Sequence, residues 1–145
     1  MASSPIWGRS YNRITAKNPS GSLILDINVN QVDDYNNFKE YYSNGILKAE
    51  GMCYVQWSGD QIIYYNSWLK WAKYYKPDGS LNCEVIEGSG IQRYWHPNGQ
   101  LLWELTLQKN KRIKLKVWSK EGKLTTERIY LPNKRIHIQP PSMVE

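Results

Sequence analysis

The sequence is poor in the residues on which many enzymes and cross-linked scaffolds depend. Its 145 residues include two Cys, two His and one Phe, and no run of 18 apolar residues. Two cysteines are too few for a disulfide-rich scaffold, and a membrane-spanning helix needs about 20 apolar residues. The first residues carry no apolar segment of a secretory signal. We therefore expect a cytoplasmic chain with reduced cysteines and no transmembrane segment.

Tryptophan and tyrosine are abundant instead. The chain has 7 Trp and 11 Tyr, 41% apolar residues and 22% charged residues. These proportions indicate a globular chain, and its length indicates a single domain, 1–145. Because Trp and Tyr favour strands and half-buried surfaces, we expect an all-β fold.

A short pattern recurs around glycines along the chain. It consists of an aromatic pair, a polar turn, the glycine, a polar residue, a leucine and often a glutamate. The glycines are Gly21, Gly45, Gly79, Gly99 and Gly122. The pattern divides the domain into units of about 18–37, 38–73, 74–93, 94–116 and 117–138, with an insertion within 61–75.

Each of these glycines is predicted to close a β-hairpin. Glycine adopts positive φ without a steric penalty, and Pro, Asn and Asp favour the preceding turn positions. We therefore expect hairpin tips at Gly45, Gly79, Gly99 and Gly122 in an antiparallel meander. Further turns are expected between them, at 57–60, 87–90, 109–111 and 132–134.

Two segments depart from the regular units. Apolar spacing within 61–75 fits a short amphipathic helix over 61–73 as well as a long strand with a bulge, and both remain open. The Asn- and Asp-rich stretch 28–37 is predicted to be a loop.

Positive charge concentrates in the C-terminal part of the chain. Residues 1–60 carry five Lys or Arg against six Asp or Glu, and residues 61–145 carry fourteen against seven. Alternation around a three-residue loop at 109–111 would pair Leu107 with Ile113. That register places Arg112, Lys114 and Lys116 in one outward row, beside Glu104 and Thr106.

The sequence contains no convincing catalytic or metal-binding constellation. His96 lies in a turn and is expected at the surface, and His137 lies in a terminal strand. Cys53 and Cys83 lack the spacing of a zinc site with these histidines. No nucleophile elbow or phosphate-binding loop is present. Four acids recur five residues after turn glycines and are expected to pair across strands with Lys or Arg; they are Glu50, Glu84, Glu104 and Glu127.

The repeats resemble a known family. Tyr41-Tyr42-Ser43-Asn44-Gly45-Ile46-Leu47 and Tyr94-Trp95-His96-Pro97-Asn98-Gly99-Gln100-Leu101 are similar to the variant MORN repeat of bacterial YwqK-family antitoxins from toxin–antitoxin systems. The resemblance covers about residues 38–131, with a weaker unit near 18–26. It implies stacked β-hairpins and a non-catalytic protein that binds a toxin or another protein, with lipid contact in MORN proteins more broadly.

These observations lead to an expected function without enzyme activity or cofactors. The leading hypothesis is a protein-binding repeat module, most specifically an antitoxin or immunity-type inhibitor that occludes its partner. Arg112, Lys114 and Lys116 are the expected partner-binding residues, with Trp95 and Trp118 beside them. A nucleic-acid-binding protein, a protein contacting anionic lipid and an accessory subunit of a larger assembly remain alternatives.

Overall fold

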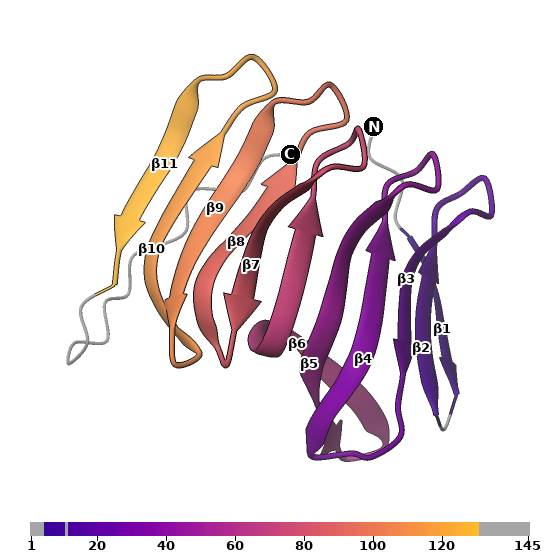
Figure 1. The fold of residues 1–145 in the computed structure, drawn as a ribbon. Helices are drawn as coiled ribbons and strands as arrows, with labels where there is room; N and C mark the ends of the chain where they lie inside the picture. Colours follow the sequence, from indigo (N-terminus) through magenta and orange to yellow (C-terminus); the bar gives the residue numbers. More distant parts are fainter. Residues whose placement is uncertain (1–4, 11, 131–145) are drawn as a thin grey trace.

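The computed structural model describes residues 5–10 and 12–130 of the chain. This part forms one sheet of eleven antiparallel strands, and the strands follow one another in chain order (Figure 1). The fold is therefore an all-β hairpin meander, and no helix occurs among the described residues. The turn predicted at 132–134, the end of the unit 117–138 and His137 lie outside them. The strands are β1 (Ile6–Ser10), β2 (Arg13–Lys17), β3 (Leu23–Asn28), β4 (Asp34–Tyr41), β5 (Leu47–Ser58), β6 (Gln61–Tyr75), β7 (Leu81–Ile86), β8 (Ser89–Trp95), β9 (Leu101–Gln108), β10 (Lys111–Trp118) and β11 (Leu124–Ile129).

Five hairpin turns along one edge of the sheet share one hydrogen-bond pattern (Figure 1). In the turn between β4 and β5, the Gly45 amide donates to the Tyr42 carbonyl at 2.9 Å, and the Tyr42 amide donates to the Ile46 carbonyl at 2.8 Å. Gly45 has a φ of 88°, and the other four turn glycines have φ of 88° or 89°. This is a type I turn closed by a left-handed residue. The hairpin tips predicted at Gly45, Gly79, Gly99 and Gly122 are confirmed.

A β-bulge follows each of these turns at the same place. The strand register shifts by one, so that the residue three positions after the glycine has no direct partner across the strand pair. A bulge bends a strand and increases its twist. Five bulges at equivalent positions thus curve the sheet and give it an inner face, which carries the core, and an outer face. The bulged residues are Ile24, Lys48, Asn82, Leu102 and Thr125.

The insertion is part of a long bent strand and contains no helix. β6 pairs with β5 on both sides of residues 66–68, which have no partners in the ladder. The far end of the β5–β6 hairpin then meets the first strand, where the Tyr64 and Trp7 rings lie 6.4 Å apart. This contact closes the N-terminal half of the sheet around the core.

Polar side chains hold the bend of β6 in place. Gln92 on β8 is fully buried, and its Nε2 donates to the Asn66 carbonyl and to the Tyr74 hydroxyl, both at 2.7 Å. Asn110, at the tip between β9 and β10, accepts a hydrogen bond from the Leu69 amide at 2.9 Å. Hydrogen bonds from β8 and from the turn between β9 and β10 therefore hold the bend in place.

The stretch 28–37, predicted to be a loop, is a loop over 29–33 and strand at its two ends. β3 continues to Asn28 and β4 begins at Asp34, so the connection spans 29–33. The Asn36 side chain is buried and accepts hydrogen bonds from the Asn30 amide at 2.7 Å and the Gln31 amide at 3.1 Å. An Asn-rich composition here supplies the polar group that fixes a short loop.

The turn between β9 and β10 also differs from its prediction. It has two loop residues, Lys109 and Asn110, with φ of 48° and 62°, in place of three. A bulge at Ile113 then restores the predicted register. As a result, Lys114 and Lys116 still lie on the outer face.

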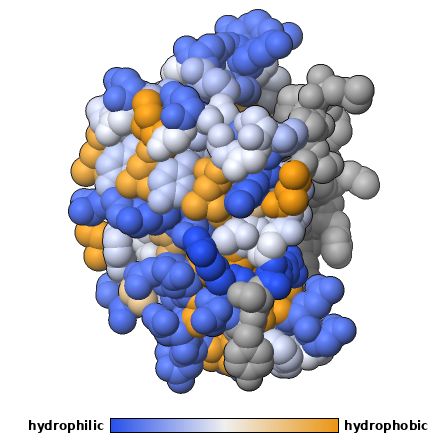
Figure 2. Space-filling view, turned by 90° about the vertical axis from the view of Figure 1, so that its right-hand side faces the viewer, coloured by the Kyte–Doolittle hydropathy of each residue, from blue (hydrophilic) through white to orange (hydrophobic). Residues whose placement is uncertain are grey.

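The core lies on the inner face and runs from β2 to β10. Apolar side chains also reach the surface. On the side of β1, shown in Figure 2, they form small groups between polar side chains, and Ile6 and Trp7 are 58% and 47% exposed. The buried cluster consists of Ile14, Ala16, Leu25, Ile27, Val29, Phe38, Ala49, Cys53, Val55, Ile62, Leu69, Ala72, Tyr74, Val85, Tyr94, Leu105 and Leu107.

Candidate functional site

The structure separates the three basic residues that were expected to form one partner-binding row. Lys114 and Lys116 lie on the outer face, as predicted. Arg112 precedes the bulge and lies opposite Leu107, which is buried in the inner face. The Arg112 Nη2 donates to the Ser67 hydroxyl at 3.4 Å. Arg112 therefore lies beside the β6 bend and not in one row with Lys114 and Lys116.

Lys116 is part of a ladder of alternating charges on the outer face. Its Nζ lies 3.7 Å from the Glu127 carboxylate, and its other neighbour across the ladder is Glu104. Glu104 in turn accepts a hydrogen bond from Arg93 at 2.7 Å. The other two predicted acids lie opposite cations in the strand register, as Lys39–Glu50 and Lys73–Glu84, in agreement with the expected cross-strand pairing. Exposed ion pairs contribute about 0–1 kcal/mol each.

Trp95 and Trp118 lie near the edge that carries the glycine turns. The Trp118 carbonyl oxygen lies 3.0 Å from His96 Nε2. The Trp95 ring lies beneath the Lys76 ammonium, 5.3 Å from the ring centroid, and also lines the largest groove described below. Of the predicted partner-binding residues, Trp95 is the one that this groove includes.

Comparing the repeats with one another identifies an unusual pair of residues. Five positions before the turn glycine, the other units have Ala16, Tyr74, Tyr94 and Val117, all buried, whereas the second unit has Glu40. Three positions after the glycine, two units have the core-packing residues Ile24 and Leu102, two have the polar residues Asn82 and Thr125, and the second unit has Lys48. The second unit therefore carries a charged pair where the first and fourth units carry apolar or aromatic side chains at both positions.

Glu40 is held in an aromatic environment. Its Oε1 accepts a hydrogen bond from the Tyr94 hydroxyl at 2.7 Å. Although part of the side chain is exposed, protein atoms surround the carboxyl group, and this burial raises its pKa above the ordinary value of 4.5. The charge of Lys48 acts in the opposite direction and lowers it. Ionisation of Glu40 thus depends on a nearby cation.

Lys48 supplies that cation and contacts two aromatic rings. Its Nζ lies 5.0 Å from the centroid of Tyr94 and 5.5 Å from that of Tyr42, within the range of cation–π attraction. Tyr42 is itself fixed, because its hydroxyl donates to the Tyr75 carbonyl at 2.7 Å. The main chain at the end of β6 therefore positions the Tyr42 ring, and Glu40 accepts a hydrogen bond from Tyr94.

Glu40 and Lys48 line an open groove of about 590 Å³ at the glycine-turn edge. The size falls in the range of sites that bind small molecules or single side chains. Its walls combine aromatic and polar groups from β1, β4, β6 and β8, which include Trp7, Tyr42, Tyr64, Trp95 and His96.

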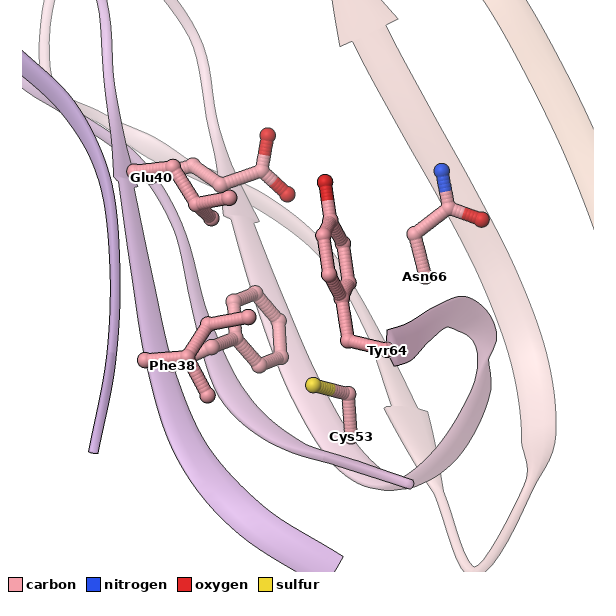
Figure 3. Close-up of a pocket in the computed structure, with 7 residues that line it drawn as sticks. Phe38, Glu40, Cys53, Tyr64 and Asn66 are labelled. Carbon is pink, nitrogen blue, oxygen red and sulfur yellow. The ribbon is translucent and has the colours of Figure 1, made fainter. Parts of the chain in front are cut away.

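A small cavity lies beside the groove, on the core side of Glu40. It measures about 10 Å³ and is lined by Phe38, Glu40, Cys53, Tyr64 and Asn66, among others. Figure 3 shows the Glu40 carboxyl and the Tyr64 hydroxyl directed toward each other across it. A cavity of this size holds one water molecule where polar groups surround it. Burial raises the pKa of Tyr64 to about 12, so its hydroxyl remains a hydrogen-bond donor.

The other candidates for chemistry offer little reactivity. Burial raises the pKa of Cys53 to about 12 and that of Cys83 to about 11, so both thiols are protonated at neutral pH and weakly nucleophilic. His96 is half-buried at the groove and not fully at the surface as predicted. Within the described residues, no group of three or more His, Cys, Asp or Glu could hold a metal ion.

The groove was missed from the sequence, although a signal for it existed. The net charge favoured the basic C-terminal half, where Arg93 and Lys116 are paired with acids. Placing the five units in register on their glycines would have shown Glu40 and Lys48 at two positions that the first and fourth units fill with apolar or aromatic residues.

Comparisons with known proteins add no assignment to this geometry. No helix among the described residues has the length and apolar character needed to cross a membrane. The chain matches no family model, no curated protein and no solved structure.

Proposed function

We propose that this chain is a non-catalytic binding module that recognises a partner protein through the aromatic groove around Glu40 and Lys48. The observation that carries the proposal is the charged pair on the inner face, at two positions where the first repeat has Ala16 and Ile24 and the fourth has Tyr94 and Leu102. An enclosed charged pair is often no more stabilising than an apolar pair of similar volume, so binding explains its presence better than packing does.

The groove also has the composition of a binding surface. Tyr and Trp supply large contact area with little loss of conformational entropy, and they dominate the binding energy of many interfaces. Trp7 is 47% exposed and Trp95 is half-buried, so both rings are available to a partner while the sheet fixes their positions. The strands that carry them belong to one continuous hydrogen-bonded sheet, which favours a pre-organised site.

The resemblance to variant MORN antitoxins extends this proposal to an antitoxin or immunity-type inhibitor. In that role the sheet occludes the active surface of a toxin and performs no chemistry.

Capture of partners from cells of the source organism, followed by mass spectrometry, tests the proposal with two matched variants. Ser43→Trp places a bulky ring in an exposed turn that lines the groove. Lys120→Trp makes the same change at the equivalent position of the last glycine turn, outside the groove lining. We expect Ser43→Trp to lose the partner and Lys120→Trp to keep it. Equal retention by both folded variants would refute the groove as the partner site.

The outer face provides a second arm of the same experiment. Reversing Lys114 and Lys116 to Glu should leave partner capture largely intact, because Lys116 is already paired with acids. Loss of the partner in this variant, together with a steep decrease of affinity with salt, would instead favour a nucleic-acid-binding function.

A further inference from the structure

Glu40 and Lys48 together determine which chemical group the groove can accept. An anionic group in place of the Lys48 ammonium would be repelled by the Glu40 carboxylate, and a neutral group in that place would leave the carboxylate without a counter-ion. A cation satisfies both the carboxylate and the rings. The groove therefore discriminates by charge as well as by shape.

The aromatic walls already hold a cation in the free chain. The Lys48 ammonium lies between the Tyr42 and Tyr94 rings, 5.5 Å and 5.0 Å from their centroids. Lys48 occupies the bulged position of β5, so it has no direct partner across the β4–β5 pair, unlike its neighbours in the strand. Its long aliphatic chain can withdraw the ammonium to solvent at little cost, as lysine side chains commonly do.

We propose that the groove accepts an arginine or lysine side chain of the partner protein, which binds Glu40 and displaces the ammonium of Lys48. In this arrangement Lys48 is an internal substitute for the partner's cation. The Tyr94 hydroxyl keeps the carboxylate oriented through its 2.7 Å hydrogen bond, and the Tyr42 and Tyr94 rings pack against the incoming charge. This inference rests on the proposed function, since it names what the partner inserts.

A direct test uses a capped amino acid as the probe. N-acetyl-arginine amide is titrated into the full chain, with binding followed by NMR chemical shifts. N-acetyl-citrulline amide is the matched probe that has nearly the same shape without the charge. We expect saturable binding of the arginine probe alone, with the largest shifts at Tyr42, Tyr94 and Glu40.

Two variants distinguish displacement of Lys48 from surface attraction. Lys48→Met vacates the site and should bind the arginine probe about tenfold more tightly than the unchanged chain, the factor expected if Lys48 occupies the site about nine-tenths of the time. Adding Glu40→Gln to Lys48→Met should abolish this gain. Equal binding of both probes, or an affinity that does not change on adding Glu40→Gln, would overturn the inference.

A measurement on the unchanged chain covers the case in which Lys48→Met does not fold. The titration midpoint of Glu40, followed by carbon-detected NMR, should fall to lower pH in the presence of the arginine probe and stay constant with the citrulline probe. A constant midpoint with both would overturn the inference. If the arginine probe binds as expected while Ser43→Trp still captures the partner, the cation site stands and the proposed partner surface fails. If Ser43→Trp loses the partner and the probe does not bind, the reverse holds.

Discussion

Gly51 is predicted to tolerate no side chain, for a reason that differs from that of the turn glycines. It lies in the middle of β5 opposite Ala72. A Cβ added at Gly51 would meet the Trp71 carbonyl oxygen at 2.2 Å and the Ala72 Cα at 2.7 Å. Real Cβ atoms rarely approach closer than 3.4 Å, so β5 and β6 would have to separate by about 1 Å where they are hydrogen-bonded.

The expected cost of Gly51→Ala follows from what would have to move. Overpacking costs about 1–3 kcal/mol where side chains can adjust, and here the obstacle is main chain, so we expect about 3 kcal/mol or more. For a chain of 145 residues the entropy of unfolding is about 0.3 kcal/mol per kelvin, which converts this loss to a fall in Tm of about 10 °C.

Gly99→Ala is the matched control. Gly99 has a φ of 89° and nothing within 4 Å of its added Cβ, so its cost is conformational alone, about 1–2 kcal/mol. Urea denaturation and thermal unfolding of both variants check the difference. If Gly51→Ala destabilises the chain no more than Gly99→Ala, the close pairing of β5 with β6 at this point is wrong, and with it the position of the bend that supports the groove.

Further predictions concern the bend and the charged pair. Gln92→Leu should lower the free energy of unfolding by about 1–3 kcal/mol in urea titrations, because it removes the donor to the Asn66 carbonyl and to the buried Tyr74 hydroxyl; a loss below 1 kcal/mol would contradict this. A double-mutant cycle of Glu40→Leu and Lys48→Leu should give a coupling energy of at least about 1 kcal/mol, since each single change leaves one charge near the rings without its counter-ion; additive effects would exclude the coupling. The raised pKa of Glu40 means that the folded state binds more protons between pH 4.5 and that raised pKa, so stability should decrease as pH rises through this window. Glu40→Gln should remove the decrease, and an unchanged pH profile would show that another group titrates.

The sequence predicted the parts of the fold that depend on local backbone chemistry. Five glycines in similar polar turns required positive φ, and that requirement alone located the five hairpin tips along one edge. The acids five residues after the glycines were correctly assigned to cross-strand pairing because a repeated position in a repeated unit has the same neighbours in each copy.

Non-local contacts decided the features that the sequence left open or predicted wrongly. Residues 61–75 have a helical spacing of apolar groups, yet β5 supplies a partner strand and Gln92 satisfies the main chain where the ladder is interrupted. Alternation of apolar residues predicts a three-residue loop at 109–111. The chain reaches the same register with a two-residue turn and a bulge at Ile113, and a bulge cannot be read from alternation alone.

Because the repeats are regular, the departure of the second unit at Glu40 and Lys48 can be interpreted. The units share one turn, one bulge and one core position. The residue at a given position of one unit can therefore be compared directly with the residue at the same position of another. Five positions before and three positions after the turn glycine, the fourth unit has Tyr94 and Leu102, which pack on the core. The second unit has Glu40 and Lys48 at these two positions. Two departures in one unit, opposite in charge and both in contact with Tyr94, are difficult to explain by packing, because an apolar pair would fill the space without burying charge. Retaining the charged pair is better explained by recognition of a cation than by stability of the sheet.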